Sequence, residues 1–202
     1  MKPNKPAVTA VPVHELIARR WSPRAFDRSK PVSREQVMAL VEAARWAPSC
    51  YGDEPWRYLI WDRHRDEAAW QRAFGCLGEG NRKWVINAPV LMASVASGVF
   101  EHNGKPNRWA QHDTGAASES ICLQATALGL AVHQMGGFDA EKLKQEFAIP
   151  EGFTPMAMIA IGYQADADIL EGEYQQRELA PRRRKPVETR FFEAAWGAGF
   201  KS

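Results

Sequence analysis

The clearest helical pattern along the chain lies in residues 33–48. Ser33 and Gln36 have the spacing of a capping box, in which each residue bonds the other's backbone amide. Pro48 ends the run, because proline cannot continue a helix. Between these two signals, apolar residues recur every three or four positions: Val37, Leu40, Val41 and Ala44. We therefore expect an amphipathic helix here, with one face in the core.

Short apolar runs predict strands at residues 57–62, 89–97 and 156–163, with a weaker candidate at 130–135. The run at 89–97 is apolar enough to be a central strand, since strands covered on both faces read as continuous apolar segments. Four further segments predict helices, at residues 14–21, 66–77, 113–130 and 139–147. In the longest of them we expect Asp113 as N-cap and Gly129 at the C-terminal end.

Few of these segments alternate strictly as strand, helix, strand, so we predict an α+β fold rather than a doubly wound parallel sheet. A chain of 202 residues fits one domain, and we assign residues 1–202 to it. Residues 1–12 hold three prolines and predict an extended arm. Residues 182–202 end in Phe191, Phe192, Trp196 and Phe200, an apolar tail that needs a surface to cover, most naturally a second subunit.

Composition excludes several classes of protein. The formal net charge is +2, which does not indicate a nucleic-acid partner. No segment reaches membrane-spanning length without charges or glycines, so we expect no membrane association. Three widely spaced cysteines argue against a disulfide framework. The first residues lack the apolar core of a signal peptide, and a cytoplasmic location follows as the expectation.

Two basic clusters lie near the ends of the chain, at residues 19–24 and 182–185. Arginine forks beside a serine hydroxyl suit a phosphate monoester, although either cluster alone is as readily a solvated surface. Gly136 and Gly137 follow a predicted strand and would let backbone approach a ligand, but such a turn is common. The chain holds neither the glycine fingerprint of dinucleotide-binding folds nor a phosphate-binding Walker loop.

Residues 47–61 leave three interpretations open. Cys50 is a candidate nucleophile, Asp53 and Glu54 are a candidate acid/base pair, and the turn residues could instead form a backbone cradle for a flat ligand. The five histidines have no ligand spacing, so we expect no metal site. The chain thus has two basic clusters and turns that would let backbone approach a ligand, but no recognisable set of catalytic side chains. This combination favours a bound cofactor that supplies the chemistry.

The order of several motifs resembles the nitroreductase family of FMN-dependent oxidoreductases. These motifs are RWSPRAF, PVSREQVMALVEAARWAPS with PWRYLIW, LQATALGLAVHQMGGFD, IPEGFTPMAMIAIGY and PRRRKPVE. The resemblance extends from about Leu16 to Val187. It implies a mostly antiparallel sheet flanked by helices in an intertwined homodimer. In that arrangement the C-terminal arm crosses to add a strand to the partner's sheet, and each of two FMN sites is built from both chains.

The resemblance also implies a role for individual residues. Arg20, Trp21, Ser22 and Arg24 match a first FMN-binding segment, with Arg20 and Ser22 on the phosphate and Arg24 near flavin N1 and O2. A loop from the other subunit that contacts the flavin ring matches Pro48, Ser49, Cys50 and Gly52, and the residue at the pyrimidine edge matches Asn81. The turn whose amides reach N5 and O4 matches Gly136 and Gly137. A second pair of phosphate-binding residues matches Arg182 and Arg184.

By the same resemblance, NADH or NADPH passes hydride to flavin N5, and an electron-poor small molecule such as a nitroaromatic or quinone then takes its place. Ping-pong kinetics follow, and no side chain is expected to be catalytic. The alternatives are enone reduction or dehalogenation on the same fold, or a non-enzymatic nucleotide- or nucleic-acid-binding module. The chain departs from the family pattern at Gly52, Glu54 and Trp84, where the family usually has asparagine, glutamine and lysine. We expect Glu54 to disfavour anionic acceptors and Trp84 to offer stacking.

Overall fold

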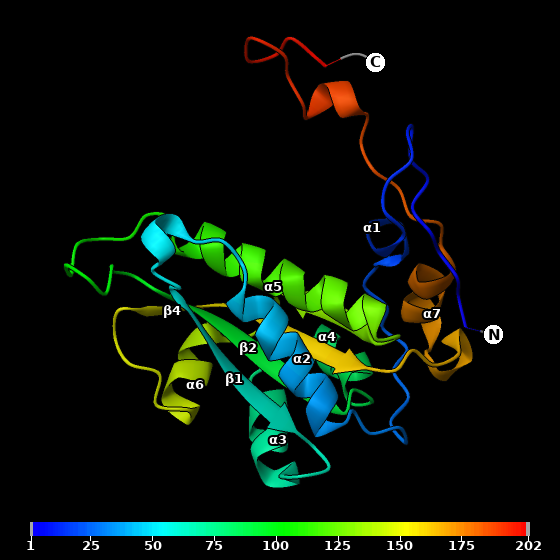
Figure 1. Ribbon diagram of the computed structural model, residues 1–202. Helices are drawn as coiled ribbons and strands as arrows, with labels where there is room; N and C mark the ends of the chain where they lie inside the picture. The colour runs from blue at the N-terminus through cyan, green and yellow to red at the C-terminus, as the bar shows by residue number, and fades with distance from the viewer. Residues whose placement is uncertain (1, 201–202) are drawn as a thin grey trace.

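A computed structural model describes residues 2–200 of the chain. Its centre is a four-stranded antiparallel sheet in the order β1-β2-β4-β3 (Figure 1). The strands are β1 (Trp56–Asp62), β2 (Val90–Ser97), β3 (Ala131–Met135) and β4 (Phe153–Gly162). All four predicted strands are confirmed, and β2 is central and buried along its whole length.

Helices cover both faces of the sheet, as the alternation of side chains along the central strands requires. Met92 on β2 packs into a core cluster with α2 (Arg34–Arg45) and α5 (Ala110–Ala127). Its neighbour Leu91 points to the opposite face, toward a second cluster with α3 (Glu67–Phe74), α4 (Glu79–Val85) and α6 (Ala140–Glu146). The predicted α+β fold with helices flanking an antiparallel sheet is therefore confirmed.

The predicted helices are confirmed, although their ends differ from the predicted ones by up to about three residues. Ser33 and Gln36 form the reciprocal capping box at the start of α2, and Asp139 caps α6. The expectation that Asp113 caps α5 is wrong, because the helix begins at Ala110 with Trp109 in the N-cap position. Asp113 is a buried residue of the first turn, and Gly129 follows the helix end with φ +71°.

Two helices that the sequence pattern did not indicate lie beside the candidate site. Helix α4 starts after Gly78 without a side-chain cap, and α7 (Gly172–Leu179) starts after Glu171, also without one. Residues 2–13 form no helix or strand and run against α1 (Glu15–Arg19) and α7: the Ala7 amide donates to the Ala18 carbonyl and Lys5 Nζ to the Glu178 carbonyl.

The C-terminal arm begins against the body of the molecule, where Arg182 donates to the carbonyls of Lys5 and Ala18. It then leaves the body, and its last part folds back on itself through a bridge between Phe192 and Gly199 (Figure 1). Its aromatic side chains are exposed, with Trp196 at 93% and Phe191 at 64%. Residues 1, 201 and 202 of the predicted domain and arms lie outside the described residues. Among residues 2–200, no helix is both long and apolar enough to cross a lipid bilayer.

Candidate functional site

The two basic clusters, some 160 residues apart in sequence, converge in the structure. They line a common cavity of ≈ 360 Å³ between the end of α1, the N-terminal arm and the chain after α7. Six of its ten lining residues are cationic, and Trp21 and Ser22 add an aromatic ring and a hydroxyl. The six cations are Lys5, Arg20, Arg24, Arg177, Arg182 and Arg184. We call this the basic cavity.

The electrostatics of the basic cavity favour an anion. Burial lowers the pKa of Arg182, and the neighbouring charges of Arg20 and Arg184 lower it further. Burial likewise lowers the pKa of Lys5, as do Arg24 and Arg182, while Glu178 opposes the shift. Cations that disfavour one another's charge gain stability when a dianion enters among them. The cavity therefore suits a phosphate group.

A buried carboxylate on α7 fixes the backbone of the first basic segment. Glu178 is fully buried, and its two carboxylate oxygens accept hydrogen bonds from the amides of Arg24 (2.9 Å) and Ala25 (3.2 Å). Lys5 Nζ donates to the Glu178 carbonyl at 2.8 Å. Sequence reasoning missed Glu178, because a lone glutamate in a polar segment gives no sign of a partner 154 residues away.

His133 on β3 holds the same segment from the other side. Its Nδ1–H donates to the Pro23 carbonyl at 2.9 Å, and its ring lies 4.6 Å from that of Trp84. Burial lowers the pKa of His133 to about 4, against a smaller opposing effect of the Pro23 hydrogen bond. His133 is therefore neutral at pH 7, and it was not among the predicted site residues.

This lowered pKa predicts a pH-dependent stability. An unfolded histidine takes up a proton near pH 6.5, whereas folded His133 resists it until about pH 4, so stability is complete above pH 6.5 and falls below it. The loss approaches about 3 kcal/mol by pH 4. Urea unfolding at several pH values from 7 to 4 should show this fall in the free energy of unfolding for the wild type and not for His133→Gln. The variant of an exposed histidine, His64→Gln, should show the same fall as the wild type. Equal slopes in all three proteins would contradict the assignment.

The glycine turn after β3 lies against α4. Asn81 Nδ2 donates to the Gly137 carbonyl at 3.0 Å, and the Gly78 amide donates to the same oxygen at 2.9 Å. Both Gly136 and Gly137 are exposed, and Gly136 has open space where a side chain would begin. Three predicted positions, Asn81, Gly136 and Gly137, thus form one exposed backbone surface.

Replacing Gly137 by alanine is expected to disrupt this surface. A Cβ there would lie 2.8 Å from Asn81 Nδ2, closer than carbon and nitrogen can approach without displacement. The Asn81 side chain should move away, and its hydrogen bond to the turn should be lost. We expect FMN affinity to fall roughly tenfold, about one hydrogen bond's worth of binding energy. Isothermal titration of the apoprotein measures this.

Gly115→Ala is the matched control, since a Cβ at that helical position meets no atom within 4 Å. Equal FMN affinity in Gly137→Ala and Gly115→Ala would contradict a role for the glycine turn in binding.

Helix α4 connects the glycine turn with the basic segment. Trp84, three residues after Asn81, lies beneath the Arg24 guanidinium, whose carbon is 6.0 Å from the indole centre. Burial lowers the pKa of Arg24, and Glu178 opposes the shift. Trp84 is only 1% exposed and packs beside Phe26 and His133, so the expectation that it offers a stacking surface is wrong.

The loop of residues 48–54, here the cradle loop, is not part of this site within one chain. It lines a separate cavity of ≈ 410 Å³ with Arg45 and Trp46. Pro48, Ser49 and Gly52 line that cavity, and Cys50 donates its amide to Asp113 Oδ2 at 2.9 Å. The structure therefore divides the predicted cofactor residues into two groups on one protomer.

The geometry of the cradle loop argues against the acid/base interpretation. Asp53 is a buried acceptor whose carboxylate bonds the Glu101 amide at 2.9 Å and Asn107 Nδ2 at 3.3 Å. Glu54 is exposed, and its amide donates to Ser49 Oγ. Tyr51 and Glu54 have positive φ (56° and 48°), a strained backbone for residues with a side chain, whereas Gly52 (66°) adopts such a φ without strain. The polar contacts of Asp53 and Ser49 therefore serve the backbone conformation of the loop.

The structure thus has an α+β fold with a cavity lined by six cations, a glycine turn connected to it through helix α4, and a separate loop at residues 48–54. The nitroreductase family model matches residues 17–163. The chain therefore belongs to the nitroreductase family, and it is an oxidoreductase.

Individual relatives and one solved structure are similar to this chain over much of its length. A Mycolicibacterium smegmatis protein named as an uncharacterized 15.4 kDa protein is 30% identical over 123 residues, which cover 61% of this chain and 81% of that protein. An oxygen-insensitive NAD(P)H nitroreductase of Salmonella typhimurium is 22% identical over 85% of this chain and 94% of its own. A crystal structure described as an oxidoreductase containing FMN is 34% identical, with a TM-score of 0.88 over 97% of this chain and 98% of that one.

Proposed function

We propose that the protein binds FMN and transfers reducing equivalents from NADH or NADPH to an electron-poor small molecule such as a nitroaromatic or quinone. The observation that carries this proposal is the convergence of the two basic clusters on one cavity. Helix α4 connects this cavity with the glycine turn, because Trp84 lies near Arg24 and Asn81 bonds Gly137. The FMN in the structure with a TM-score of 0.88 supports the identity of the anion.

The residues present fit FMN. Arg20, Ser22, Arg182 and Arg184 line the basic cavity and would hold the phosphate. Arg24 would supply positive charge at the pyrimidine edge, where reduction leaves negative charge on the flavin. The exposed glycine turn, with a position that a Cβ would fill, provides backbone for the ring. When bound, FMN would accept hydride at N5 and release electrons to the second substrate.

The protein's own contribution is positioning and electrostatics. Glu178 and His133 fix the backbone that carries Arg24, and neither is placed to transfer a proton to substrate, since each is committed to backbone partners. Water would supply the protons that the acceptor needs. The absence of a required side-chain acid is consistent with a broad range of acceptors.

We further propose a homodimer in which the cradle loop and C-terminal arm act on the partner subunit. The cradle loop lies apart from the basic cavity in its own chain, and the arm exposes aromatic side chains such as Trp196. A second copy would complete the site and cover the arm. Light scattering of the purified protein should give twice the mass of the 22.7 kDa chain.

Initial-rate kinetics test the proposed activity. NADH is varied at several fixed concentrations of a nitroaromatic or a quinone. The double-reciprocal plots should be parallel, because the oxidised nicotinamide product leaves before the acceptor binds. Intersecting lines would indicate that both substrates bind together. No NAD(P)H oxidation with either acceptor would contradict the proposal.

A further inference from the structure

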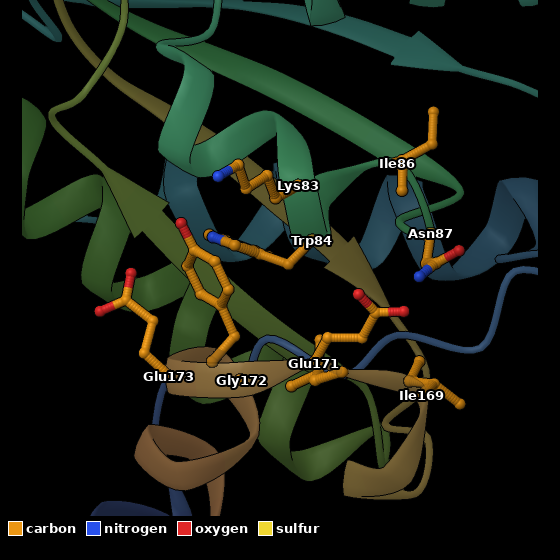
Figure 2. Close-up of a pocket in the computed structure, with 10 residues that line it drawn as sticks. Lys83, Trp84, Ile86, Asn87, Ile169, Glu171, Gly172 and Glu173 are labelled. Carbon is orange, nitrogen blue, oxygen red and sulfur yellow. The ribbon is translucent and has the colours of Figure 1, made fainter.

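A further cavity, which no step above uses, lies between α4 and the chain leading into α7. Its volume is ≈ 660 Å³, within the range of small-molecule sites. Figure 2 shows the side chains of Lys83 and Glu171 on opposite walls, and Tyr174 also lines the cavity. We call it the α4–α7 cavity.

The α4–α7 cavity adjoins the candidate cofactor site. Helix α4 contributes Asn81 to the glycine turn and Lys83 and Trp84 to the cavity. Trp84 also lies near the first basic segment, since its ring centre is 6.0 Å from the guanidinium carbon of Arg24. A ligand in this cavity could therefore extend to a group bound beside Arg24.

Both wall charges are free to meet a ligand. Neither the Lys83 side chain nor that of Glu171 forms an ion pair or hydrogen bond with another described residue. Glu171 occupies the N-cap position of α7, yet its carboxylate accepts no bond from the first turn. Glu173, by contrast, is paired with Arg177 at 2.8 Å.

The rest of the lining combines apolar and hydrogen-bonding groups. Ile86, Ile169 and Leu170 provide apolar surface, and Asn87 adds an amide. Flat bases pack on apolar surface, and a carboxylate is the group that accepts hydrogen bonds from both hydroxyls of a ribose. An ammonium group such as that of Lys83 suits a pyrophosphate. Base, ribose and pyrophosphate together describe the adenosine diphosphate half of a dinucleotide.

We propose that the α4–α7 cavity binds the adenosine half of the reduced nicotinamide dinucleotide, with Glu171 accepting the ribose hydroxyls. Glu171 then makes NADH the better donor, because the 2′-phosphate of NADPH would lie against its carboxylate and near Glu173. This inference rests on the proposed oxidoreductase function and adds a site and a preference to it.

Glu171→Gln tests the proposal, because the residue is exposed and caps nothing, so folding should be unaffected. We expect the KM for NADH to rise roughly tenfold, the loss of one charge-assisted hydrogen bond, and the KM for NADPH to fall. Reduced nicotinamide mononucleotide lacks the adenosine half and serves as the second probe. Its KM should be the same in the variant and the wild type.

The matched control is Glu151→Gln, an exposed glutamate before β4, at the opposite end of that ten-residue strand from α7. It should leave all three KM values unchanged. Unchanged KM values for NADH and NADPH in Glu171→Gln would overturn the inference. So would a rise in the KM for the mononucleotide as large as that for NADH. Either result would leave the oxidoreductase function standing. Failure of the wild type to oxidise any of the three donors would contradict the proposed function and, with it, this inference.

Discussion

Glu178→Ala is expected to lower the free energy of unfolding by about 3 kcal/mol, since it leaves two buried amides without an acceptor. These amides belong to Arg24 and Ala25, and the Glu178 side chain is their partner on α7. The same change should weaken FMN binding, because the segment that carries Arg24 loses its anchor. Urea unfolding and FMN titration measure the two effects.

Two variants make the Glu178 result specific. Glu173→Ala removes another glutamate of the same helix, but one that is exposed and paired only with Arg177, so a loss below about 0.5 kcal/mol is expected. Glu178→Gln keeps one carbonyl acceptor, so its loss in the free energy of unfolding should lie between those of Glu178→Ala and Glu173→Ala. If Glu178→Ala were no more destabilising than Glu173→Ala, the anchoring role of the buried carboxylate would be wrong.

Arg20→Ala is expected to weaken FMN binding by roughly 30-fold, in line with the loss of a charged hydrogen bond to a phosphate. The reason is that Arg20 lines the basic cavity, where it is also held by Glu119 at 3.2 Å. Riboflavin, which has no phosphate, should bind the variant and the wild type equally. Fluorescence titration with both flavins measures the difference.

Arg19→Ala is the matched control for Arg20→Ala, because Arg19 is an exposed neighbour on α1 that does not line the basic cavity. It should leave FMN affinity within twofold of the wild type, the range expected of an exposed substitution. Equal weakening of FMN and riboflavin by Arg20→Ala would show a general disturbance of the site rather than the loss of a phosphate contact.

Much of the fold follows from local signals in the sequence. The capping box of Ser33 and Gln36 and the apolar run of β2 each specify their own element, because caps and periodicity act over a few residues. The wrong cap at Asp113 has a tertiary cause. Its carboxylate accepts hydrogen bonds from the Cys50 amide and from His112, so this aspartate inside the helix serves a contact with the cradle loop rather than a cap.

The candidate site was predictable only in part, because its parts are distant in sequence. Arginine clusters and paired glycines could be recognised one by one, but their convergence needed the fold. Glu178, His133 and Lys5 gave no local signal: each supports the first basic segment or its neighbours through hydrogen bonds between residues more than 100 positions apart. The α4–α7 cavity depends on two helices that the pattern did not indicate.

The most direct test of the central proposal is the absorption spectrum of the purified protein, as isolated and after incubation with FMN. We predict a yellow protein with a bound-flavin band that NADH bleaches under anaerobic conditions and that a nitroaromatic or quinone restores. A colourless protein that cannot be reconstituted with FMN, or a flavin band that neither NADH nor NADPH bleaches, would contradict it.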